Sequence, residues 1–215
     1  MIRFVSFILL FLLSGCSFKS QPNMWQYSSA QSFESYKQNL LKGNKTLAKH
    51  DLKEAIKYAK SSADLSQLAS IYLGKCALNK ALGREDNCKE FKKIEPLITS
   101  IKLKNYYLFI QKDIDAVDTE YLPTKYQDFA KALQNGNTKR ANEVILQIED
   151  PISQMITLSL LDKKATKRSL KTTLQNVSFY GYKEGVLYLL KELLKKEKNP
   201  TKRAVIKQKL TILSQ

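Results

Sequence analysis

Apolar residues recur every three or four positions along most of the chain, which is the spacing of one face of an α-helix. The pattern is clearest over residues 64–82, 184–197 and 202–213, each of which is predicted to form an amphipathic helix. Glycine, proline and asparagine interrupt it at Gly43-Asn44, Gly83, Pro96, Leu122-Pro123, Asn135-Gly136-Asn137, Asp150-Pro151, Gly181 and Asn199-Pro200. The segments between these breaks have the length of helices, and none alternates in the way of a strand. The sequence therefore predicts an all-α protein.

Three segments of the predicted helical region share one pattern: residues 50–59, 136–145 and 181–189. Each carries a small residue (Ala55, Ala141 or Gly185) that would let two helices cross closely. The pattern resembles the second helix of a tetratricopeptide repeat. The resemblance implies antiparallel helical hairpins packed as a short tetratricopeptide-like solenoid over residues 33–215. The small residues are 86 and 44 positions apart rather than multiples of 34, so an irregular helical bundle is the alternative.

The N-terminus carries a positive charge at Arg3 and then an apolar run over residues 4–13, which is short for a membrane span. The following residues, Leu13-Ser14-Gly15-Cys16, resemble the lipobox of bacterial lipoprotein signal peptides. The resemblance implies that residues 1–15 are a signal peptide and that Cys16 carries a diacylglycerol and an acylated amine. Polar residues 16–32 are then a lipidated flexible tether. An uncleaved anchor or a buried N-terminal helix is the alternative.

A lipoprotein of this kind is attached to the bacterial cell envelope, and Ser17 after the lipidated cysteine indicates the outer membrane, facing the periplasm. Because the exported compartment is oxidising, Cys76 and Cys88 are predicted to form a disulfide. Residues 83–86 would form the turn between two helices, and Asn87 would cap the second helix together with Glu90. Two separately buried thiols are the alternative.

The chain has a formal net charge of +16, and its 36 basic residues are mostly lysine. Residues 163–215 hold 14 basic and 3 acidic residues, so the C-terminal quarter carries most of the excess. An exported protein does not meet nucleic acid as its ordinary partner, which leaves lipid headgroups, lipopolysaccharide, cell-wall carboxylates and acidic proteins. The candidate residues for an anionic surface are Lys195, Lys196, Lys202 and Arg203. A solvated lysine-rich face is the simpler interpretation.

The sequence offers little material for catalysis. His50 is the single histidine, and its position before Asp51 favours a turn or helix cap over a general base. The chain contains no glycine-rich phosphate loop and no nucleophile elbow. The acidic run over residues 113–120 lacks the glycine and distal glutamate of a calcium loop. We therefore expect no catalytic residues, no metal site and no cofactor.

These patterns together predict a non-enzymatic periplasmic scaffold or adaptor that is held to the membrane by its N-terminal lipid and binds an envelope protein partner. The alternative is a surface or envelope lipoprotein whose basic C-terminal region binds anionic lipid, lipopolysaccharide or a host surface. Neither function involves nucleic acid, and the sequence carries no signal for an oligomeric state.

Overall fold

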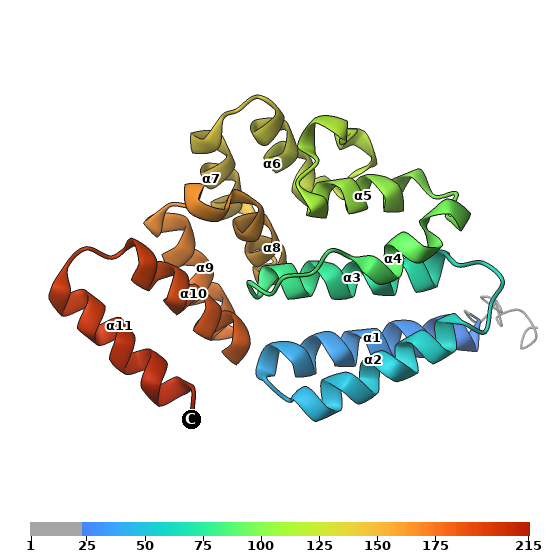
Figure 1. The fold of residues 1–215 in the computed structure, drawn as a ribbon, viewed down its shortest axis with the longest axis horizontal. Helices are drawn as coiled ribbons and strands as arrows, with labels where there is room; N and C mark the ends of the chain where they lie inside the picture. The colour runs from blue at the N-terminus through green and yellow to red at the C-terminus, as the bar shows by residue number, and fades with distance from the viewer. Residues whose placement is uncertain (1–22) are drawn as a thin grey trace, which may run out of the picture.

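The computed structural model describes residues 23–215, which form eleven α-helices and four short 3-10 turns with no β-strand in that range (Figure 1). The predicted all-α class is confirmed, with successive helices packed in adjacent pairs. The predicted signal peptide (residues 1–15) and the lipid-bearing Cys16 lie outside the described residues. In the described part of the chain, no helix is both long and apolar enough to cross a bilayer.

The helices are α1 (Met24–Lys42), α2 (Lys45–Ala59), α3 (Ser66–Ala81), α4 (Lys89–Ile94), α5 (Ile101–Gln111), α6 (Thr124–Gln134), α7 (Thr138–Gln147), α8 (Pro151–Leu161), α9 (Lys167–Phe179), α10 (Lys183–Lys196) and α11 (Pro200–Leu213). The 3-10 turns are η1 (Glu95–Leu97), η2 (Ile114–Ala116), η3 (Thr119–Tyr121) and η4 (Asp162–Lys164). The acidic run over residues 113–120 begins just before η2 and extends through η3, and its four carboxylate side chains are exposed.

Three of the helical hairpins, α1/α2, α6/α7 and α9/α10, close through the same turn. The first helix ends at a glycine with positive φ, which is 89° at Gly43, 65° at Gly136 and 66° at Gly181. The backbone N–H of the next residue then donates to the carbonyl five positions earlier, over 2.8 Å from Asn44, 2.8 Å from Asn137 and 3.0 Å from Tyr182. This is the Schellman arrangement, in which a glycine without a Cβ adopts the left-handed conformation at no steric cost.

The small residues of the predicted pattern are buried, but they do not all occupy one register. Ala141 is five residues after its turn glycine, and Ala48 has the same place in α2. Ala55, which the sequence pattern had matched to Ala141, lies further along α2, where its carbonyl accepts from Ser29 Oγ over 3.0 Å. Ala48 and Ala55 are seven residues apart, so they lie on the same side of α2, and both are buried.

Gly185 is the small residue with the tightest surroundings. A Cβ at this position of α10 would lie 2.8 Å from Met155 Sδ of α8 and 3.7 Å from Val177 Cβ of α9. The absence of a side chain therefore lets α10 approach both α8 and α9.

Helix α8 forms the centre of the fold. It contains no charged residue, and every position except Ser159 is buried. A helix that is apolar on all sides requires cover on all sides. Helices α3, α6, α7 and α9 supply this cover.

The C-terminal part of the fold turns back to the N-terminal hairpin, because α10 packs against α1 (Figure 1). Arg84 donates to Glu184 over 2.7 Å, across 100 positions of sequence. The Tyr188 ring covers Gly83, whose missing Cβ would lie 2.3 Å from that ring. These contacts join the C-terminal hairpin to the N-terminal part of the fold. Helix α11 packs against α10 and has no fully buried residue.

Two local predictions were wrong. Residues 24–32, predicted as part of the tether, form the first half of α1. The buried contact in this half is made by a serine, Ser29, and hydrophobic periodicity does not detect a polar contact. His50 is neither a turn nor a cap residue, because α2 begins at Lys45 and places His50 on its exposed surface.

We expect Gly185→Leu to lower the free energy of unfolding by about 2 kcal/mol, because the new side chain must displace Met155 from its packed position. Urea titration followed by circular dichroism measures this change. Arg140→Leu is the matched control, since Arg140 stands four residues after Gly136 as Gly185 does after Gly181, but is exposed. The control is expected to change stability by less than about 0.5 kcal/mol. Equal effects of the two substitutions would contradict the close crossing.

Candidate functional site

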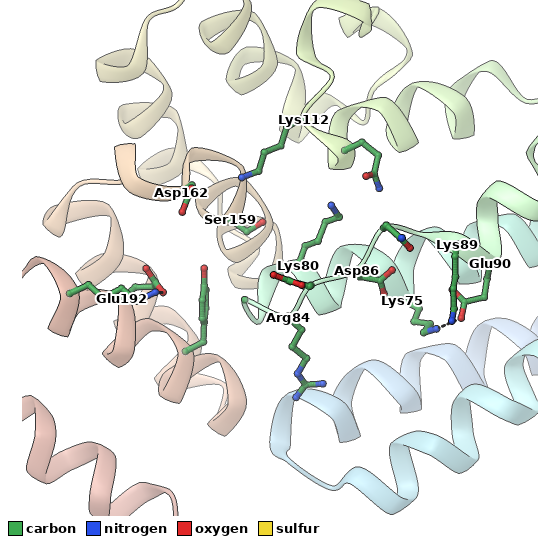
Figure 2. Close-up of a pocket in the computed structure, with 16 residues that line it drawn as sticks. Lys75, Lys80, Arg84, Asp86, Lys89, Glu90, Lys112, Ser159, Asp162 and Glu192 are labelled. Carbon is green, nitrogen blue, oxygen red and sulfur yellow. Dashed lines mark hydrogen bonds and ion pairs between the residues drawn. The ribbon is translucent and has the colours of Figure 1, made fainter.

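A large hollow lies between the loop after α3, the exposed face of α10 and the ends of α5 and α8 (Figure 2). Its volume is about 950 Å³. The lining residues are mostly charged or polar: Lys75, Lys80, Gly83, Arg84, Glu85, Asp86, Asn87, Lys89, Glu90, Gln111, Lys112, Ser159, Asp162, Tyr188, Glu192 and Lys195.

A second hollow of about 780 Å³ adjoins the first and shares Gly83, Arg84, Tyr188, Glu192 and Lys195 with it. It extends to the turn between α1 and α2 and reaches Ser214 after α11. We call the two hollows together the charged cleft. Ten basic and six acidic residues line it.

The loop that forms one wall of the charged cleft is held by the predicted disulfide, which is present between Cys76 of α3 and Cys88 at the start of α4, with Cα atoms 5.3 Å apart. Asp86 braces the same loop, because its carboxylate accepts from Asn79 Nδ2 and from the Cys88 backbone N–H, each over 2.8 Å. Gln111 Nε2 of α5 lies 2.9 Å from Cys88 Sγ. The wall is therefore tied to both α3 and α5.

The predicted cap at Asn87 and Glu90 was wrong. Cys88 itself precedes the first turn of α4, with φ of 53° and no side-chain cap. Glu90 instead accepts from Lys75 Nζ of α3 over 2.6 Å, and Figure 2 shows the two side chains meeting at one end of the hollow. Cys88 rather than Asn87 occupies the N-cap position, so Glu90 is two residues after the cap instead of the three that the predicted cap requires.

Backbone strain gathers around the charged cleft. Only three non-glycine residues of the described chain have positive φ, namely Cys88, Lys112 and Asp162, with φ of 53°, 65° and 50°. Lys112 and Asp162 line the cleft, and Cys88 lies between the lining residues Asn87 and Lys89. Each such residue costs on the order of 1–3 kcal/mol and persists only where the surrounding structure enforces it. Strain of this kind concentrates at functional sites, which makes the cleft the candidate site.

Side chains of both signs line the first hollow, and two of its lysines lie near enough to influence each other. Figure 2 shows Lys112, which directly follows α5, and Lys80 of α3, both of which line the hollow. Burial and then the charge of Lys112 lower the pKa of Lys80; Asp86 opposes this shift, and Lys92 adds to it. Burial, together with the charges of Glu192 and Asp162, raises the pKa of Tyr188 to about 12, so this phenol is uncharged at neutral pH.

Some of the charges in the cleft are already paired. Glu90 pairs with Lys75, Glu184 with Arg84, and Glu192 with Lys195. Among the described residues, Lys80, Lys89 and Lys112 have no carboxylate within ion-pair distance. An anionic group entering this end of the cleft would therefore meet unpaired ammonium groups.

The four basic residues proposed from the C-terminal sequence lie in different surroundings. Lys195 lines the cleft and pairs with Glu192. Lys196 Nζ donates to the Lys163 carbonyl over 2.8 Å. Arg203 donates to the carbonyls of Leu194 and Glu197, over 2.8 and 2.7 Å, and so caps the end of α10. Lys202 is exposed on α11.

Metal-ligand chemistry has little support in the described residues. Cys76, Asp86 and Cys88 lie close together, but both sulfurs are in the disulfide and provide no thiolate.

The residues that sequence reasoning missed are Lys80, Lys112, Asp162 and Tyr188 of the cleft. They come from four separate elements, and no motif in the sequence links them.

Comparison with known proteins adds no relative: no family model matches this chain, and neither a curated protein nor a solved structure matches it. The site therefore rests on the geometry of the chain itself.

We expect reduction of the Cys76–Cys88 disulfide to lower the free energy of unfolding by about 3 kcal/mol, because the crosslink restricts the unfolded chain. Urea titration with and without reductant measures the difference. A Cys76→Ser/Cys88→Ser variant should show the lower stability and no response to reductant. Unchanged stability of the wild-type chain on full reduction would contradict the bracing role.

Lys112→Gly is expected to raise the free energy of unfolding by about 1 kcal/mol, because glycine adopts φ of 65° without the Cβ clash that lysine has. Lys102→Gly in the first turn of the same helix is the control and should lower stability, since lysine favours that helical position. Thermal or urea unfolding of both variants measures the two signs. A loss of stability in Lys112→Gly would show that no strain is relieved there.

Proposed function

We propose that this protein is a lipid-anchored, non-enzymatic scaffold of the bacterial envelope, which faces the periplasm and holds a segment of a partner protein in the charged cleft. The observation that carries the proposal is the concentration of backbone strain and unpaired lysines around a cleft whose wall is braced by a disulfide. A structure that maintains strain at one place, against its own stability, supports a role for that place in binding.

The character of the cleft supports a protein segment as the ligand. Sites for small molecules are mostly apolar, with a few polar groups, whereas this lining is largely charged. The two hollows together extend from the end of α5 to the end of α11. An extended segment several residues long would fill such a trough and could pair its charges along it.

The charges specify the kind of segment. Because Lys80, Lys89 and Lys112 have no carboxylate partner in the part of the chain that the structure describes, the segment should carry Asp or Glu at the end that enters between α3 and α5. Electrostatic contacts of this kind increase the association rate and weaken with salt. The lipid predicted at Cys16 would keep the protein at the membrane, which raises the local concentration of membrane-bound partners.

The alternative function, binding of an anionic surface through Lys195, Lys196, Lys202 and Arg203, has weaker support. Three of the four side chains are engaged in bonds within the chain. Arg203 in particular stabilises the link between α10 and α11, so its removal would disturb the fold as well as the charge.

The test is photocrosslinking of the full-length protein in its native membranes, with a photoreactive residue in place of the exposed cleft residue Glu85. The same residue in place of Lys171, which is exposed on α9 outside the cleft, is the control. We expect defined adducts with an envelope protein from position 85 and none of these from position 171.

Charge reversal then tests the chemistry. Lys80→Glu/Lys112→Glu is expected to reduce the adducts at least about tenfold, because the acidic segment would be repelled. Lys131→Glu/Lys139→Glu, on α6 and α7, makes the same change of charge outside the cleft and should leave them unchanged. The proposal fails if both positions give the same adducts or if both variants behave alike. Turnover of purified cell wall by the protein would overturn the non-enzymatic part.

A further inference from the structure

Helix α2 carries a row of four lysines at intervals of four residues: Lys45, Lys49, Lys53 and Lys57. All four are exposed. At about 1.5 Å per residue the row is about 18 Å long. Figure 1 shows α2 at one edge of the molecule, where it packs against α1 and α3. Lys42 and Lys60, also exposed, lie just beyond the two ends of the helix.

Within residues 23–215, most of the row is not neutralised. Helix α2 has two carboxylates, of which Asp51 accepts from Asn39 of α1 over 2.7 Å and Glu54 pairs with Lys57 over 3.2 Å. Among the described residues, Lys45, Lys49 and Lys53 have no ion-pair partner. Like charges four residues apart on a helix destabilise it. An external negative charge would therefore stabilise the helix that carries the row. Lys45 is the only one of the four lysines that also lines the charged cleft.

We propose that the lysine row lies against the anionic phospholipid headgroups of the membrane that holds the lipid anchor. The inference rests on the proposed lipid attachment at Cys16. Asn23, the first described residue, is seven positions after Cys16, and an extended chain of that length spans at most about 25 Å. The membrane surface is therefore within reach of the start of α1.

The hairpin places the row beside that anchor point. Ser29 near the start of α1 bonds to Ala55 near the end of α2, so the Lys57 end of the row is the end next to the tether. Met24 and Tyr27, with 69% and 54% of their surfaces exposed, lie at the same end of the hairpin. Tyrosine is favoured at the membrane interface, so these side chains suit a membrane-facing end.

The chemistry of the row favours lipid over a protein partner. Cores of protein interfaces are depleted of lysine, whereas a layer of anionic headgroups attracts flexible ammonium groups without demanding fixed geometry. A basic surface combined with acyl chains is also a common way to strengthen membrane attachment. Docking of α2 would orient the molecule on the membrane, which the lipid alone would not do.

The test is lysine footprinting of the full-length protein, purified in detergent and reconstituted into vesicles of phosphatidylglycerol and phosphatidylcholine or of phosphatidylcholine alone. An amine-reactive acetylating reagent labels accessible lysines, and mass spectrometry quantifies each site and shows whether Cys16 carries lipid. We expect Lys45, Lys49 and Lys53 to label about threefold less in the anionic vesicles, with the difference lost in about 0.5 M salt. Lys131 and Lys139, on the exposed surfaces of α6 and α7, should label equally in both.

A triple variant, Lys45→Gln/Lys49→Gln/Lys53→Gln, should abolish the protection of the neighbouring Lys60 in anionic vesicles. The matched Lys131→Gln/Lys139→Gln variant should retain it. Equal labelling of α2 in both kinds of vesicle, in protein that carries the lipid, overturns the docking inference and leaves the anchor intact. If the α2 lysines are protected in protein that carries no lipid at Cys16, the result supports docking of α2 and overturns the proposed lipid anchor. Protection in native membranes but not in vesicles would assign the row to an envelope partner and overturn the lipid contact.

Discussion

The need to cover helix α8 on every side determines how the other helices are arranged. Residues 151–161 contain no charge, so each face of this helix must meet a neighbour. Its polar side chains are satisfied internally. Gln154 donates to the carbonyls of Ile145 and Ile148 and accepts from Asn176, and Ser153 meets Tyr126 over 2.9 Å. These bonds connect α8 to the hairpins on either side and fix its rotation about its own axis.

This arrangement has a consequence for the surface. Helices α3 and α9 both pack on α8, and α10 follows α9, so the later helices are brought back beside the loop after α3. The charged cleft forms at that junction, where Tyr188 covers Gly83 and Arg84 meets Glu184. The packing of the interior therefore also forms the candidate site, and the disulfide braces the loop that makes one wall of the cleft.

The sequence predicted what depends on local spacing. Helical periodicity, the glycine turns and the pairing of Cys76 with Cys88 all follow from residues close together in the chain. The start of α1 was missed because its buried contact is a serine hydroxyl rather than an apolar side chain. The cleft was missed because Lys80, Lys112, Asp162 and Tyr188 meet only after the helices have packed. The positive φ of Lys112 was also missed, since lysine has no preference for the left-handed conformation.

The pair of Arg84 and Glu184 also bears on the order in which the molecule assembles. Each hairpin joins residues close in sequence and can form as soon as it is made, whereas contacts across 100 positions form slowly and late. One wall of the cleft comes from residues 83–90 and another from residues 188–195. The cleft therefore cannot exist until nearly the whole chain has been synthesised. A chain that stops early would carry folded hairpins without a binding site. Only a chain that extends through α10 could therefore bind the partner.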